Sequence, residues 1–272
     1  MEEKYPKVIY KYRDWDNCHH RKLLSHNELY IPSVSQINDP YDCLINFDYS
    51  KLENGKLSSK EAVSLFKELE SELKKLGYDC DSLLNIRNKD DFEKIINIKK
   101  EFDRKLIEKR KEHLGVISFS RRWDSILMWS HYSKCHTGFC VGFNTENLII
   151  SNYFHTGGNV NYTQDYPRVT PFESSDKKMI QVFYNKSKDW EYEQEYRMTK
   201  LLGYHSKKDE FKIQKIYNFS NYDISEVIVG VKTSESNINQ ILQICKEKKI
   251  ALYQTEDIPY KFKLNKKVIF RP

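Results

Sequence analysis

This chain of 272 residues has few glycines, no Cys-x-x-Cys pair, no long apolar run and no internal repeat. Its six cysteines are scattered without Cys-x-x-Cys spacing, so we expect reduced thiols instead of a disulfide framework. The nine glycines form no phosphate-binding loop, which argues against the common nucleotide-binding motifs. Because no stretch approaches the length of a membrane span and no opening run resembles a signal peptide, we expect a cytoplasmic protein without a membrane partner.

Charge and aromatic content set weaker limits on the partner. The 45 basic and 39 acidic residues are interleaved, and the net charge of +6 permits an anionic partner without requiring one. The 19 tyrosines suit surfaces that must be both flat and polar.

A metal site is the first possibility to weigh among the polar residues. His131, Cys135, His136 and Cys140 lie close together in the sequence. Cys140 belongs to an apolar, alternating run, however, and is expected to point into a core. The acidic residues also lack the spacing of a metal nuclease. We therefore expect no metal.

The stretch 188–198 carries the densest group of candidate site residues. As a strand, it places Glu193, Glu195 and Arg197 on one face, and two carboxylates about 7 Å apart beside a cation can hold and polarise a sugar. As a helix, it makes Glu193 and Arg197 an i,i+4 ion pair on a solvated face. Alternating aromatic residues and the run into Leu201 favour the strand.

The hydrophobic patterns predict an α+β protein, with a single domain over residues 1–272 built on a twisted, mixed β-sheet. A helical insertion is expected at about 56–113. Expected strands cover residues 7–13, 28–31, 43–47, 115–120, 138–143, 159–163, 211–216, 225–230 and 250–254. Expected helices cover residues 18–26, 58–76, 90–106, 124–132, 179–186 and 238–245.

Five motifs stand in order along the chain. They are Tyr10-Lys-Tyr-Arg13; Leu29-Tyr-Ile-Pro-Ser33 with Asn38-Asp-Pro-Tyr-Asp42; Ser118-Phe-Ser120; Leu127-Met-Trp-Ser-His-Tyr132 with His136-Thr-Gly-Phe-Cys-Val-Gly-Phe143; and Trp190-Glu-Tyr-Glu-Gln-Glu-Tyr-Arg197. Together they resemble a widespread prokaryotic and phage family of unassigned function, over most of the chain outside 56–113.

A second resemblance concerns the order of the expected elements. An opening strand with a polar pair, a helix and strand after it, and Glu195 on a late strand before 224–229 resemble the plan of ADP-ribosyltransferases. The DarT-type enzymes that modify DNA are nearest in plan. This resemblance implies a split mixed sheet that binds NAD as a substrate. It also implies transfer of ADP-ribose to a nucleic acid or protein by a toxin or anti-phage effector, with an antitoxin or regulatory partner.

The same resemblance assigns roles to individual residues. Glu195 takes the place of the catalytic glutamate, and Glu193 would orient or deprotonate the acceptor. Cleavage of the nicotinamide–ribose bond builds an oxocarbenium-like charge that a carboxylate can stabilise. The residues implied in binding NAD are Lys11, Tyr12, Arg13, Ser118, Ser120, Trp129, His131, Tyr132 and Arg197.

Two further classes of function stay open. One is an enzyme that hydrolyses NAD or cleaves nucleic acid with the same carboxylates, and the other is a non-catalytic module that binds nucleic acid. Trp129 can equally be a core aromatic residue, and His131 can equally be a histidine whose hydrogen bonds serve the fold alone. If the site exists, residues from several strand ends should converge on one cleft. Replacing Glu195 with Gln is then expected to slow turnover and leave thermal stability nearly unchanged.

Overall fold

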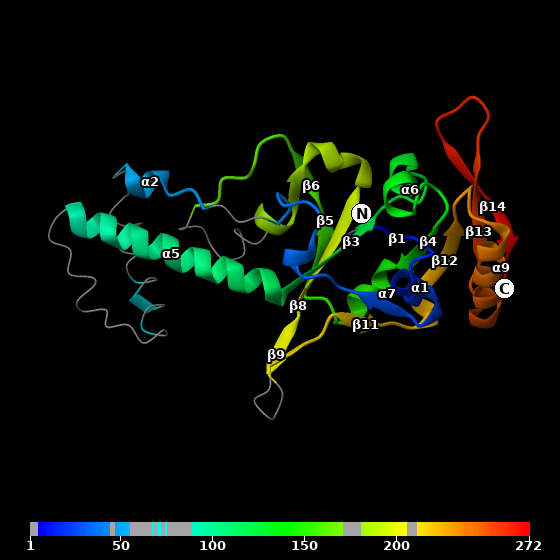
Figure 1. The fold of residues 1–272 in the computed structure, drawn as a ribbon, viewed down its shortest axis with the longest axis horizontal. Helices are drawn as coiled ribbons and strands as arrows, with labels where there is room; N and C mark the ends of the chain where they lie inside the picture. The colour runs from blue at the N-terminus through cyan, green and yellow to red at the C-terminus, as the bar shows by residue number, and fades with distance from the viewer. Residues whose placement is uncertain are drawn as a thin grey trace.

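The computed structural model describes residues 5–43, 47–54, 67, 70–71, 74, 89–170, 181–205 and 211–272. One large sheet consists of β1 (Val8–Arg13), β3 (Leu114–Ser120), β4 (Phe139–Asn144), β5 (Thr156–Asn159), β8 (Glu195–Leu201), β12 (Ile224–Val229), β13 (Leu252–Asp257) and β14 (Leu264–Phe270). Their order across the sheet is β14-β13-β12-β4-β1-β3-β8-β5 (Figure 1). Strands β12 and β13 are parallel, and the other neighbouring pairs are antiparallel. The expected α+β fold on a mixed sheet is confirmed.

Short strands and helices complete the described part of the chain. The paired short strands are β2 (Glu28–Tyr30) with β11 (Ile216–Asn218), β6 (Asn161–Thr163) with β7 (Asn185–Ser187), and β9 (Gly203–His205) with β10 (Phe211–Ile213). The helices are α1 (Cys18–Ser25), α2 (Ser50–Glu53), α5 (Lys89–His113), α6 (Ile126–Tyr132), α7 (Thr145–Ile150) and α9 (Glu235–Lys248). Three 3₁₀ turns are η1 (Val34–Gln36), η2 (Lys188–Glu193) and η3 (Asn221–Asp223).

The sheet is covered by helices on both faces because its strands alternate between two apolar sets. One face packs against α1, α7 and α9, where Leu24, Leu148 and Ile241 are fully buried. The other face presents Tyr12 to Trp129 of α6 in an edge-to-face contact with ring centroids 5.1 Å apart. Ser125 caps the N-terminus of α6, because its hydroxyl accepts from the Met128 amide. Glu195 and Arg197 of β8 point to this second face, because Tyr196 and Met198 pack in the core on the first.

The expected helical insertion is seen only in its later part. Helix α5 confirms the helical pattern over 90–106 and runs away from the sheet (Figure 1). The pattern over 58–76 falls almost wholly outside the described residues, as does most of the strand expected over 43–47.

Two expected elements near the site are only partly correct. The first part of the stretch 188–198 is the 3₁₀ turn η2, because the Ser187 hydroxyl accepts from the Asp189 amide and Gln194 adopts a left-handed conformation (φ 43°). The strand begins only at Glu195. The helix expected over 179–186 is confirmed at residues 181–183 but ends early, because residues 185–187 form β7. Strand β14 was not anticipated.

Candidate functional site

The sheet opens between β1 and β3, and this opening forms the candidate site. The two strands pair at a single position, Tyr10 with Ser120. By contrast, β1 pairs with β4 along its whole length. Beyond the junction, the Lys11 ammonium donates to the Ser118 carbonyl at 2.5 Å, where a ladder hydrogen bond would otherwise lie. The eight strands form one continuous sheet, so the split implied by the resemblance is limited to this local divergence.

A cavity of about 620 Å³ occupies the opening and extends to α6 and η1. It brings together most of the residues singled out in the sequence. The candidates that line it are Lys11, Tyr12, Arg13, Ser118, Ser120, His131, Tyr132, Glu193 and Glu195. Trp129 and Arg197 are not among its lining residues. Groups from β1, β3, α6, η2 and β8 therefore meet although they are far apart in the chain.

Arg197 lies beneath the cavity and is fully buried. Its guanidinium donates to Glu195 at 2.6 and 2.9 Å and to Asp42 at 2.8 and 2.7 Å, so both carboxylates are held by two hydrogen bonds. A fifth hydrogen bond, of 2.8 Å, runs to the Phe183 carbonyl. Arg197 is therefore a buried anchor for two carboxylates and not a group that can grip a ligand.

Lys186 joins Glu195 to Glu193. Its ammonium lies 3.2 Å from Glu195 Oε2, 2.6 Å from Glu193 Oε2 and 3.7 Å from Asp42. The resulting network holds three carboxylates against two cations, all nearly inaccessible to solvent. Burial raises the pKa of Glu195, but Arg197 and Lys186 outweigh burial and lower that pKa to about 2. The floor of the cavity thus carries one negative charge in excess.

Glu193 stands at the side of the cavity formed by α6. Its Oε1 accepts from the Tyr132 hydroxyl at 2.5 Å. On the same helix, His131 Nδ1 lies 2.9 Å from the hydroxyl of Tyr192. These contacts fix the turn η2 against α6, and they leave Glu193 without any hydrogen bond to Arg197. The i,i+4 pair of Glu193 with Arg197, weighed as an alternative, is not formed.

The opposite wall is basic. Burial lowers the pKa of Lys11 well below its usual value, and the nearby Arg13 lowers it further. Burial also lowers the pKa of Arg13 to about 10, which leaves it protonated at neutral pH. Arg13 donates to the Tyr12 carbonyl at 3.3 Å, and none of the described carboxylates pairs with it. Arg13 is thus a fixed cation with donors to spare.

Two expectations are corrected by this geometry. Trp129 is a core residue, since it is fully buried and its indole donates to the Trp123 carbonyl at 2.7 Å. The expectation that Glu195→Gln leaves stability unchanged is inconsistent with the ion network, because the change would remove a buried partner of Arg197.

Asp42 and Lys186 were missed as site residues. Asp42 follows a proline-bounded loop, and its partner Arg197 is 155 residues away, so no local pattern links them. The only signal was its place in the Asn38–Asp42 motif. Lys186 was assigned to a helix, whereas the strand β7 aims it at the carboxylates.

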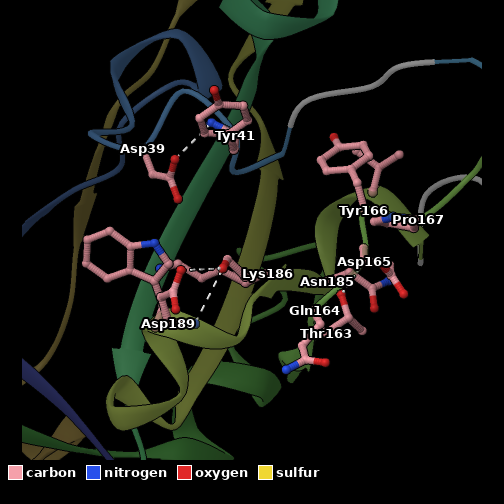
Figure 2. Close-up of a pocket in the computed structure, with 13 residues that line it drawn as sticks. Asp39, Tyr41, Thr163, Gln164, Asp165, Tyr166, Pro167, Asn185, Lys186 and Asp189 are labelled. Carbon is pink, nitrogen blue, oxygen red and sulfur yellow. Dashed lines mark hydrogen bonds between the residues drawn. The ribbon is translucent and has the colours of Figure 1, made fainter.

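A second cavity, of about 300 Å³, shares Lys186 with the first. Figure 2 shows Asp39 and Tyr41 on one side of it and Tyr166 with Pro167 on the other. Trp190 also lines it, and the Lys186 ammonium lies 5.0 Å from the centre of its ring. The carboxylate network therefore lines the first cavity, and Lys186 connects it to a second cavity that is lined by aromatic, acidic and polar residues.

The described residues lack a metal site and a membrane-spanning helix. No three His, Cys, Asp or Glu side chains there lie close enough to hold a metal ion. No described helix has the length and apolar character needed to cross a membrane.

Comparison with known proteins gives one match. A model of a family described as a protein of unknown function (DUF2971) matches residues 128–198. This range includes nearly all of the two later motifs, on α6 with β4 and on η2 with β8, whereas the earlier motifs lie outside it. Neither the search of curated proteins nor that of solved structures finds a match. From Met128 on α6 to Met198 on β8, the chain is therefore similar to this family of unknown function, DUF2971.

Proposed function

We propose that the protein is an ADP-ribosyltransferase that cleaves NAD and transfers ADP-ribose to a macromolecular acceptor. The observation that carries this proposal is the separation of charge across one cavity. A buried network with an excess carboxylate lies on one side. On the other side lie Lys11 and Arg13, and Arg13 pairs with none of the described carboxylates. A dinucleotide has a matching polarity, because its pyrophosphate is anionic and its nicotinamide ring is cationic.

The basic wall suits the pyrophosphate. The planar guanidinium of Arg13 can donate two parallel hydrogen bonds to phosphate oxygens. A phosphate beside Lys11 would favour its protonated form, which its burial now disfavours. Tyr12 is almost wholly buried and donates to the Arg122 carbonyl, so it supports this wall instead of stacking on the ligand.

The carboxylates suit the reacting ribose. The bond between the ribose C1′ and the nicotinamide nitrogen breaks, and its electron pair leaves with nicotinamide. Positive charge then develops on C1′ and the ring oxygen, and the fixed charge of Glu195 stabilises it. An acceptor nucleophile adds to C1′, and its proton passes to Glu193. Arg197 and Lys186 hold Glu195 in place and lower its pKa, and Lys186 also holds Glu193.

The test is incubation with NAD labelled in its adenylate half, together with separate protein and nucleic-acid pools. We expect release of nicotinamide and label on one of the pools, both reduced at least about a hundredfold in Glu195→Gln. Nicotinamide release without label on either pool would identify an NAD hydrolase. If the folded wild-type protein releases no nicotinamide with any pool, the proposal is overturned.

A further inference from the structure

The hairpin that joins β13 to β14 ends in two aromatic residues that do not pack against the described part of the protein. Tyr260 and Phe262 at its tip are fully exposed. The hairpin extends beyond the rest of the molecule (Figure 1). Its tip is nevertheless ordered by backbone hydrogen bonds from Lys261 to the Ile258 carbonyl and from Ile258 to the Lys263 carbonyl. Large rings held on an ordered, protruding tip indicate a surface that meets a partner.

The backbone at Tyr260 is unsuited to its side chain. Pro259 and Tyr260 are the central residues of the turn closed by the Lys261 amide, and Tyr260 has φ 61°. A positive φ at this place in a turn favours glycine. A tyrosine therefore stands where glycine would suit the fold better, which indicates that the ring serves something other than folding.

Cations accompany the rings and continue toward the candidate site. Lys261 and Lys263 alternate with the aromatic residues and are exposed. Leu264, at the base of the hairpin, packs in the same cluster as Met128 and Trp129 of α6. Lys263 lies near enough to Asp124 to contribute, after the hydrogen bond from Arg122, to the lowered pKa of that carboxyl.

Two arginines continue the series of cations that begins with Lys261 and Lys263, from the hairpin toward Glu193 and Glu195. Arg122 pairs with Asp124 at 2.8 Å. Arg121 donates through its amide and its Nε to the carbonyl of Gln194, the residue between Glu193 and Glu195. Asp257, at the end of β13, is the exposed acid nearest the tip in sequence. The hairpin and the turn at Gln194 are therefore connected by a mostly basic strip.

We propose that this hairpin and strip bind single-stranded nucleic acid, with bases stacked on Tyr260 and Phe262 and phosphates along Lys261, Lys263, Arg122 and Arg121. Alternating rings and cations are the features that hold an unpaired strand. A flat bilayer would reach only the protruding tip, whereas a flexible polyanion can follow the cations to α6. This inference concerns where a partner docks and does not depend on the proposed reaction.

Binding is measured by fluorescence anisotropy with a labelled 20-nucleotide oligothymidine, the matching oligouridine and a 20-base-pair duplex. We expect the wild type to prefer the single strands. Replacing both Tyr260 with Gly and Phe262 with Ala should weaken binding at least about tenfold, since each base–ring stack is worth roughly 1–3 kcal/mol. Tyr260→Phe should keep the affinity. Lys261→Gln with Lys263→Gln should lower the slope of log affinity against log salt by roughly 1.4.

Controls separate binding from folding and from catalysis. Tyr260→Gly should leave the melting temperature equal or higher, because glycine suits the positive φ. Tyr222, which is exposed before the start of β12 and so at the opposite end of the sheet from the tip, should be replaceable by Ala without effect. Glu195→Gln should still bind oligonucleotide, so failure of the proposed reaction would leave this result standing. An affinity unchanged by loss of both rings, or ring-dependent binding to phosphatidylserine vesicles without oligonucleotide binding, would overturn the inference.

Discussion

Arg197 illustrates how strongly a buried charge depends on its partners. Its guanidinium is fully enclosed and shares its donors between Glu195 and Asp42. Such a group is tolerated only because the carboxylates replace the water it has lost. Removing one carboxylate leaves part of the charge uncompensated, which typically costs about 3–5 kcal/mol.

Glu195 and Glu193 should therefore respond differently to loss of charge. Glu195→Gln should lower the melting temperature by roughly 6 °C or more and reduce nicotinamide release at least about a hundredfold. Glu193→Gln should lower the melting temperature less. The amide oxygen can still accept from the Tyr132 hydroxyl, and Lys186 still has Glu195 as an ion-pair partner. Both quantities are measured at a temperature where each variant is folded. Full turnover in a destabilised Glu195→Gln protein would make Glu195 a scaffold residue only.

The pKa of Glu195 also predicts how stability depends on pH. Its folded-state pKa is about 2 and its ordinary value is 4.5. The stabilisation is present above pH 4.5 and is lost as the pH falls toward 2, because the unfolded chain takes up the proton first. Urea unfolding from pH 6 to pH 2.5 should show this loss in the wild type and a smaller loss in Glu195→Gln. Equal slopes for the two proteins would contradict the assignment.

At the scale of single residues, sequence could identify members of the site but not their pairing. The placement of Glu195 and Arg197 on the same face of a strand was predictable, and in the structure the two side chains form an ion pair. Asp42 was not predictable as their partner, because the contact crosses most of the chain. Arg13 was identified, whereas the fact that no carboxylate among the described residues pairs with it emerges only from the packing.

At the scale of elements, the turn η2 shows why periodicity fails near a site. Charged and aromatic residues alternate over 188–193 as they would in a strand, yet Ser187 caps a 3₁₀ turn there. The strand β8 after it was predicted because its apolar residues Tyr196 and Met198 enter the core. Tertiary contacts with α6 decide the conformation of the preceding turn.

Gly138, just before β4, positions the basic wall by close approach. A Cβ there would lie 2.2 Å from the Arg13 carbonyl oxygen, which belongs to the backbone and cannot rotate away. Gly138→Ala should therefore destabilise the fold by about 1–3 kcal/mol and weaken NAD binding by shifting Arg13. Thermal melts and NAD titrations check both effects.

Gly158 on β5 is the matched control. A Cβ there would lie 3.1 Å from Cε1 of Tyr184, a side chain that can turn aside. Gly158→Ala should change NAD binding little. Equal losses of NAD affinity in both variants would show that Arg13 is not the cause.

At the scale of the whole molecule, the sheet was predictable as mixed but its strand order was not. Neighbours such as β3 and β8 are brought together from distant parts of the chain. Hydrophobic alternation indicates that a strand has a buried face and carries no information about which strand lies beside it. The cavity follows from this order, since it needs β1 and β3 to be adjacent and to diverge.

Binding of NAD to this cavity should stabilise the protein as a whole. At a concentration of a hundred times Kd the gain is about 2.7 kcal/mol, which raises the melting temperature by several degrees. Arg13→Gln should reduce that shift strongly. Lys134→Gln should not, because Lys134 lines the same cavity but is already paired with Asp16 at 2.6 Å. A shift equal in all three proteins would mean that NAD binds elsewhere.

The hydrogen bond from Lys11 to the Ser118 carbonyl links ligand binding to the shape of the sheet. One half of the sheet runs from β14 to β1 and the other from β3 to β5. The two halves are joined by the pair Tyr10 with Ser120 and by the Lys11 side chain. An anion that draws the Lys11 ammonium away from the carbonyl would release one hydrogen bond between β1 and β3. Affinity for the anion and separation of the two half-sheets are then thermodynamically coupled, and whatever widens the gap also strengthens binding.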